Sequence, residues 1–234
     1  MRPVDTDDLI RVAKRLDRLE EKFVFLGGSI VGFLLDHPRL THARQTNDVD
    51  AVMEAATRIE YTDMEERLRK EADFRHDTSE GAPACRWIMD DIKVDIMPTR
   101  DPTGQFANQW FPYAFQTAVR REFERVAFYT VTATCFLATK ISAFRARGKN
   151  DYRSSHDLED IITVVDGRNS LCDELASERS DVRYFVACGV GELLGESEFI
   201  EALPGHLPPD SASQQRLPMV LRRLRKMALL GSTP

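Results

Sequence analysis

Carboxylates at regular spacing in two apolar segments are the residues of this sequence best suited to do chemistry. Asp48 and Asp50 stand two positions apart in the run 48–53, and Asp95 stands in the run 92–98. Side chains of a β-strand alternate between its faces, so Asp48 and Asp50 are expected to point the same way. A buried carboxylate needs a cation or hydrogen-bond donors nearby. Hard divalent ions prefer oxygen ligands, so the three aspartates are candidate ligands of Mg²⁺, with Mn²⁺ as an alternative.

A glycine turn precedes these aspartates. Gly27, Gly28 and Ser29 follow the apolar run 23–26. A strand that ends in glycines and opens a helix leaves backbone N–H groups that can bind a phosphate, which approaches closely because glycine has no Cβ. An ordinary strand-to-helix turn is the alternative, since such turns are common. With the aspartates, the turn favours metal-dependent chemistry on a nucleoside triphosphate.

Length and composition are typical of a soluble globular protein. The chain has 234 residues, of which 42% are hydrophobic and 30% charged, and its net charge is −6. This charge argues against a surface covered by nucleic acid but permits a local basic cleft. The four cysteines include no CxxC pair, which disfavours a zinc site or a disulfide framework. The sequence has no signal-peptide pattern and no apolar run of transmembrane length, so we expect a cytoplasmic protein without a membrane partner.

The hydrophobic pattern predicts an α+β fold, in which helices pack on a small mixed β-sheet and a helical C-terminal part follows. Strands are expected at residues 23–26, 48–53, 74–78, 84–90 and 92–97. Helices are expected at residues 5–21, 30–35, 57–72, 132–147, 156–166, 170–177, 181–194 and 211–230. Ser29 is the expected N-cap of the second helix. From about residue 116 the pattern is mostly helical, which predicts an α/β core at 1–115 and a helical domain at 116–234.

Lys140 is the unusual residue of the helical part. It lies one turn from both Phe136 and Phe144 in an apolar stripe. A lysine at such a position either extends past its neighbours to solvent or meets an anion, and both explanations stay open. Asp157 and Asp160, three positions apart on the next expected helix, are placed to orient Lys140 or an arginine.

In chain order, these motifs resemble those of the polymerase-β-like nucleotidyltransferase superfamily, in particular its AbiEii-type bacterial branch. The family's glycine motif and Asp-x-Asp motif correspond to Gly28-Ser29 and to Asp48 and Asp50, and its third carboxylate corresponds to Asp95. The segment 136–149 is similar to the family's lysine-bearing helix, and the segment 157–161 to its closing helix. The gap between Ser29 and Asp48 is longer than in the family, and Ser155-His156 replaces the basic residue expected before Asp157.

The resemblance implies a role for each motif. Asp48, Asp50 and Asp95 would be the catalytic, metal-binding carboxylates. Gly27, Gly28 and Ser29 would bind the nucleotide. Lys140 would contact its phosphates, and Asp157 would support that site. Some members of this branch are toxins, so an antitoxin is an expected partner.

Transfer of a nucleoside monophosphate from an NTP to an acceptor hydroxyl is therefore the predicted function. An RNA end, a protein and a small molecule all remain open as the acceptor. One alternative is a metal-dependent glycosyltransferase that uses its Asp-x-Asp motif to bind a nucleotide sugar. Another is a non-catalytic nucleotide-binding protein of the same fold.

Overall fold

The computed structural model describes residues 4–37, 43–100 and 108–231, and these form two compact units. The first unit comprises the described residues of Met1–Ile30 and Gln45–Thr132, and the second comprises those of Val31–Arg44 and Ala133–Pro234. Each unit is therefore built from two separate stretches of the chain. The sequence analysis placed a division near residue 115. The two compact units divide after residue 132, and the segment 31–44 groups with the helical unit.

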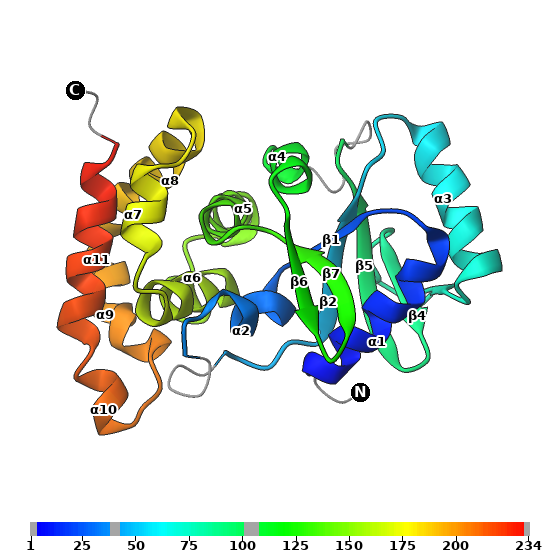
Figure 1. Ribbon diagram of the computed structural model, residues 1–234. Coiled ribbons are helices and arrows are strands. Elements are labelled where there is room, and N and C mark those ends of the chain that lie inside the picture. Colours follow the sequence, from blue (N-terminus) through cyan, green and yellow to red (C-terminus); the bar gives the residue numbers. More distant parts are fainter. Residues whose placement is uncertain (1–3, 38–42, 101–107, 232–234) are drawn as a thin grey trace. The chain divides into compact units, whose positions relative to one another are not determined.

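A mixed β-sheet forms the centre of the first unit (Figure 1) and has seven strands in the described residues. In the order in which they lie side by side, the strands are β3 (Arg75–His76), β4 (Arg86–Met89), β5 (Ile92–Pro98), β2 (Asp48–Met53), β1 (Phe23–Leu26), β7 (Val126–Thr130) and β6 (Val119–Phe123). Strands β2 and β5 are parallel, as are β1 and β7, and the other neighbouring pairs are antiparallel.

The described residues of this sheet unit include three α-helices. They are α1 (Thr6–Leu16), which continues into a 3-10 turn at Asp17–Leu19, α3 (Arg58–Glu71) and α4 (Phe111–Gln116). Helix α1 packs against β7, and α4 packs against β1 and β2. A reciprocal capping box begins α1, in which Asp5 accepts from the backbone N–H of Asp8 and the Asp8 side chain accepts from that of Asp5. The fully buried core of the unit includes Trp87, Phe74, Leu9, Leu16, Leu68, Met89 and Ile92.

The second unit is helical. Its helices are α2 (Val31–Leu34), α5 (Ala133–Arg147), α6 (His156–Gly167), α7 (Leu171–Ala176), α8 (Ser180–Gly195), α9 (Ser197–Ala202), α10 (Ser211–Gln214) and α11 (Leu217–Leu229), with a 3-10 turn at Leu203–His206. Helices α5, α6, α8 and α11 pack on one another. A Cβ at Gly189 of α8 would lie 2.6 Å from Cγ2 of Ile141 on α5, so the close packing of these helices requires glycine there. None of the helices in the described parts of the chain has both the length and the apolar character needed to span a bilayer.

The predicted fold class is confirmed, and most elements lie where the sequence placed them. Strands β1 and β2 match their predicted bounds, and β5 is one residue longer than predicted. Ser29 is a correction, because it lies inside a 3-10 turn (Gly28–Ile30) rather than at a helix N-cap, and α2 is shorter than predicted. The predicted loop at 38–46 lies in part outside the described residues, and its Thr46 forms a β-bridge with Val4.

The sequence analysis missed the short helices α4 and α9 and the hairpin of β6 and β7. The two strands of the hairpin are joined by Glu124 and Arg125, which both have positive φ, 48° and 67°. A two-residue turn of this kind usually contains glycine or asparagine, and this one contains neither. Without that signal, the segment after residue 116 resembled the start of the helical part.

Thr57 provides a test of how α3 begins. Its side chain accepts a hydrogen bond from the Glu60 backbone N–H, and the Glu60 carboxylate accepts from the Thr57 backbone N–H. Because Thr57→Ala removes half of this capping box, we expect it to lower the free energy of unfolding by about 1 kcal/mol in urea denaturation. Thr62→Ala, an exposed change inside the same helix, should alter it by less than about 0.5 kcal/mol. Equal effects of the two changes would contradict the capping role.

Candidate functional site

The three predicted carboxylates come together on one face of the sheet. Asp50 of β2 is the register partner of Asp95 of β5, and Asp48 is two residues before Asp50 on the same face. Asp95 is buried, and Asp48 and Asp50 are half-buried. This placement follows from the alternation in β2, where Val49 and Ala51 face the core on the other side. The sheet thus concentrates negative charge at one location.

Arg86 of β4 neutralises part of this charge. It is opposite Asp95 in the antiparallel β4–β5 hairpin. Its Nε is 2.7 Å from Oδ1 of Asp95, and its Nη2 is 2.7 Å from Oδ2 of Asp95 and 2.6 Å from Oδ2 of Asp48. The hydrogen bond to Asp95, together with the charges of the aspartates, raises the pKa of Arg86 despite its partial burial. One guanidinium therefore bridges two of the three candidate ligands.

The sequence analysis did not select Arg86, although the sequence contains a signal for it. The turn of the β4–β5 hairpin lies at Asp90 and Asp91, and the φ of Asp90 is 55°. Counting outward from those two residues along an antiparallel pair places position 86 opposite position 95. An arginine opposite a buried aspartate is a charge pair that this count can identify.

Cys85 lies in the electrostatic field of the same carboxylates. Burial raises the pKa of its thiol to about 12, and the charges of Asp95 and Asp50 add to the effect. The thiol is therefore protonated at neutral pH. Hard divalent ions prefer oxygen ligands, so the carboxylates and not the Cys85 sulfur are the candidate ligands here.

The glycine turn lies against Asp50. Gly27 has a φ of 72°, a conformation that glycine adopts readily, and a Cβ at this position would be 1.9 Å from Oδ2 of Asp50. Two residues later, Oγ of Ser29 is buried and has no hydrogen-bond partner among the described residues. A buried polar atom without a partner is unfavourable and is often explained by a bound group. The turn thus combines a close backbone approach at Gly27 with a buried hydroxyl that has no hydrogen-bond partner among the described residues.

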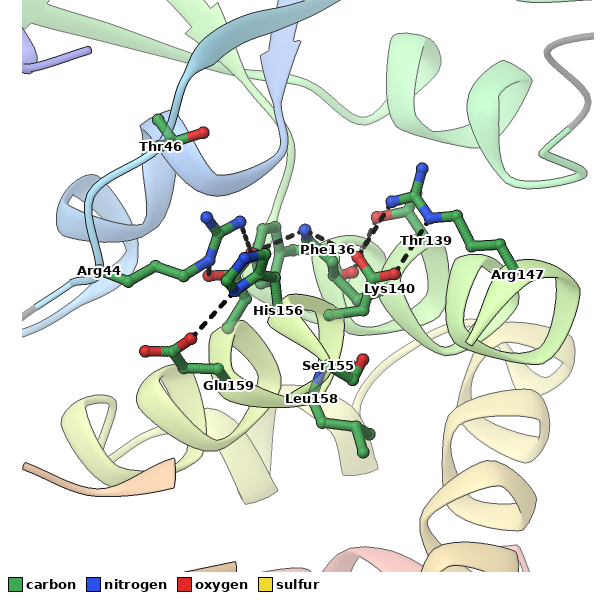
Figure 2. Close-up of polar contacts among 12 residues, drawn as sticks. Arg44, Thr46, Phe136, Thr139, Lys140, Arg147, Ser155, His156, Leu158 and Glu159 are labelled. Carbon is green, nitrogen blue, oxygen red and sulfur yellow. Dashed lines mark hydrogen bonds and ion pairs between the residues drawn. The ribbon is translucent and has the colours of Figure 1, made fainter. Parts of the chain in front are cut away.

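In the helical unit, Lys140 is part of a buried ion-pair network with two aspartates of α6 (Figure 2). Its Nζ is 3.1 Å from Oδ1 of Asp157 and 2.7 Å from Oδ2 of Asp160. Arg147 also donates to Asp157, at 3.2 Å, and Arg44 donates from Nε to Asp160, at 2.9 Å. Of the two explanations for Lys140, the structure favours contact with an anion, because the two aspartates supply that anion.

The cations of this network explain why the pKa of the Asp157 carboxyl is lowered. Burial alone would raise the pKa of its carboxyl, but the charge of Lys140 and the hydrogen bond and charge of Arg147 outweigh burial, and the pKa lies below its ordinary value of 3.8. Both aspartates are buried, whereas Arg147 is largely exposed. Three cationic side chains thus contact these two buried carboxylates.

The donor set of the sheet unit suits a hard divalent cation in its chemistry and its strand register. Carboxylate oxygens are the ligands that Mg²⁺ prefers. In residues 4–37, 43–100 and 108–231, however, no three acidic, histidine or cysteine side chains are already arranged around one point as metal ligands. Arg86 accounts for this at Asp48 and Asp95, because its guanidinium lies between them. The three aspartates therefore suit a divalent cation, and the guanidinium of Arg86 occupies the position between Asp48 and Asp95.

The same fold occurs in a solved structure. No protein-family model and no curated protein matches this sequence. An antigenic nucleotidyltransferase-like protein from Paracoccidioides brasiliensis is 19% identical over 86% of this chain and 94% of its own, with a TM-score of 0.52. A putative nucleotidyltransferase from H. pylori is 10% identical over 96% of this chain and 92% of its own, with a TM-score of 0.45. The first similarity shows that the chain has the fold of a nucleotidyltransferase-like protein.

Gly27→Ala tests the close approach of the turn to Asp50. The new Cβ would collide with the carboxylate, and the backbone would also be strained at a φ of 72°. Gly81 is a matched control, since its φ is 78° but a Cβ there would have no neighbour within 4 Å. We expect Gly81→Ala to lower the free energy of unfolding by about 1 kcal/mol and Gly27→Ala by at least about twice as much. Equal losses of unfolding free energy in urea denaturation would show that Gly27 does not pack closely against Asp50.

Asp157→Asn tests the buried ion pairs of the helical unit through their pH dependence. A carboxyl whose pKa is lowered by folding stabilises the protein above its unfolded pKa, and this contribution is lost as the pH falls through the folded pKa. We therefore expect the variant to be less stable than the wild type by about 2 kcal/mol at pH 7, and the difference to shrink as the pH falls below about 3.8.

The control for this measurement is Asp173→Asn, which breaks the exposed pair with Lys226 in the same unit. Its effect should stay below about 1 kcal/mol at every pH, because exposed ion pairs contribute little. A difference between Asp157→Asn and the wild type that does not change between pH 7 and pH 3 would contradict the proposed charge pairing.

Proposed function

We propose that this protein is a nucleotidyltransferase, which transfers a nucleoside monophosphate from an NTP to an acceptor hydroxyl in a reaction that depends on Mg²⁺. One observation carries the proposal: Asp50 and Asp95 are register partners on parallel strands, Asp48 shares their face, and Gly27 packs against Asp50. The fold, which is that of a nucleotidyltransferase-like protein, supports the proposal.

The sheet unit would contribute two groups of residues. Asp48, Asp50 and Asp95 would hold the metal, with Mn²⁺ as an alternative to Mg²⁺. Bound metal would activate the acceptor hydroxyl and neutralise the charge that develops on the triphosphate and the leaving pyrophosphate. The turn of Gly27 and Gly28 would let a phosphate approach the backbone, and the unpartnered Oγ of Ser29 would donate a hydrogen bond to it. These residues act by positioning and charge, without a covalent intermediate.

The helical unit would contribute Lys140 and Asp157. Lys140 lies in a group of three cationic side chains with Arg44 and Arg147, and cations of this kind would suit a phosphate. Asp157 would hold Lys140 in place through the pair at 3.1 Å. Their assignment to the nucleotide rests on the family resemblance.

The acceptor and the biological setting are proposed only as broad classes. An RNA 3′ end, a protein and a small molecule each offer a hydroxyl, and the net charge of −6 slightly favours the smaller acceptors. The expectations of an antitoxin partner and of a cytoplasmic location come from the family resemblance and from the sequence.

Nucleotide binding without transfer is a second candidate function, because the guanidinium of Arg86 already engages Asp48 and Asp95. A glycosyltransferase that uses the pair Asp48 and Asp50 leaves Asp95 and the glycine turn without a role. The test below separates these functions by what is transferred.

The decisive test incubates the protein with each NTP, labelled at the α-phosphate, with Mg²⁺ and a cell extract. We expect label to become attached to an acceptor, and Asp50→Asn or Asp95→Asn to reduce the transfer at least about a hundredfold, because charge stabilisation is removed from the transition state. The matched control is Asp91→Asn, since Asp91 is an exposed aspartate at the β4–β5 turn, and this variant should retain activity.

The other outcomes are equally informative. Equal transfer by the wild type and by Asp50→Asn would remove the carboxylates from the mechanism. Binding of an NTP without transfer to any acceptor would favour the non-catalytic function. Transfer of label only from a nucleotide sugar labelled in its sugar would identify a glycosyltransferase.

A further inference from the structure

We propose that Arg86 is an internal competitor of the divalent cation, so that its guanidinium must leave Asp48 and Asp95 before these carboxylates can bind a metal. The inference rests on the proposed function, because it concerns the same carboxylates. It assigns a role to a residue that is not among the candidate ligands.

The first argument is the number of oxygen atoms that Arg86 engages. Its guanidinium takes both carboxylate oxygens of Asp95 and Oδ2 of Asp48, at 2.6–2.7 Å. The remaining oxygen of Asp48, Oδ1, accepts a hydrogen bond from Oγ1 of Thr46 at 3.2 Å. Every oxygen of these two aspartates therefore already accepts a hydrogen bond, three of the four from Arg86, whose guanidinium occupies the space between the two carboxylates.

The second argument is electrostatic. Two cations that share a partly buried carboxylate repel each other strongly at a separation of a few ångströms. The side chains of Arg86 and Asp95 are 17% and 11% exposed, so water screens this repulsion only in part. Arg86 and a divalent cation therefore exclude each other from the space between Asp48 and Asp95.

The third argument concerns the hydrogen bonds that hold the guanidinium in place. Within the described residues, the side chain of Arg86 makes hydrogen bonds only to Asp48 and Asp95. Arg86 is also the first residue of β4, so it lies at the N-terminal end of that strand. Its release needs no rearrangement of the sheet, because the backbone pairing of β4 with β5 does not depend on the side chain.

Direct measurement of Mn²⁺ binding tests the proposal, with free Mn²⁺ followed by electron paramagnetic resonance. Arg86→Gln keeps a hydrogen-bond donor but removes the charge, and we expect it to bind Mn²⁺ at least about tenfold more tightly than the wild type. Arg75→Gln, an exposed change on the neighbouring strand β3, should alter the affinity by less than about twofold, because solvent and salt screen its charge.

A second variant shows whether the loss of charge or a loss of folding causes the change in affinity. Arg86→Lys keeps the positive charge, so it should be as well folded as the wild type by circular dichroism and should show no gain in affinity. Adding Asp95→Asn to Arg86→Gln should abolish the gain, because it removes a ligand that Arg86 had occupied. As an independent readout, Mn²⁺ should raise the melting temperature of Arg86→Gln more than that of the wild type.

Failure of this inference and failure of the proposed function give different results. If the wild type and a folded Arg86→Gln both bind Mn²⁺ with equal affinity, Arg86 is no competitor, and the metal site of the proposed function remains. If neither protein binds Mn²⁺ at millimolar concentration, the metal site itself is wrong and the inference fails with it.

Discussion

Three carboxylates on one face of a small sheet are the physical constraint around which the first unit of this protein is organised. Parallel pairing of β2 with β5 makes Asp50 and Asp95 neighbours, and the alternation of β2 adds Asp48. Such a cluster is stable only if positive charge lies close to it. Among the described residues, Arg86 supplies a guanidinium that engages two of the three carboxylates, Asp48 and Asp95.

The helical unit also contains buried carboxylates that are paired with cationic side chains. Asp157 and Asp160 are buried on α6, and they are surrounded by Lys140, Arg147 and Arg44. Here three cationic side chains contact two buried carboxylates. The contribution of Lys140 to nucleotide binding stays a prediction.

The part of the site that the sequence could reveal is the part carried by local patterns. Asp48, Asp50 and Asp95 are conspicuous because each stands among aliphatic residues in a short strand. Arg86 became recognisable only through its strand register, which depends on the position of a turn between β4 and β5. The hairpin of β6 and β7 was missed for a related reason, since Glu124 and Arg125 adopt positive φ without the residues that usually mark such a turn.

The pairing of β4 with β5 has a consequence for how the acidic face is assembled. Asp48 and Asp95 are far apart in the chain, and the pairing of β2 with β5 brings them together. Arg86 and Asp95, in contrast, belong to one hairpin and are joined by a short turn. The third carboxylate therefore has its counter-charge on the neighbouring strand of its own hairpin. This local pair offsets the repulsion that a bare carboxylate would meet beside Asp48 and Asp50 when β5 pairs with β2.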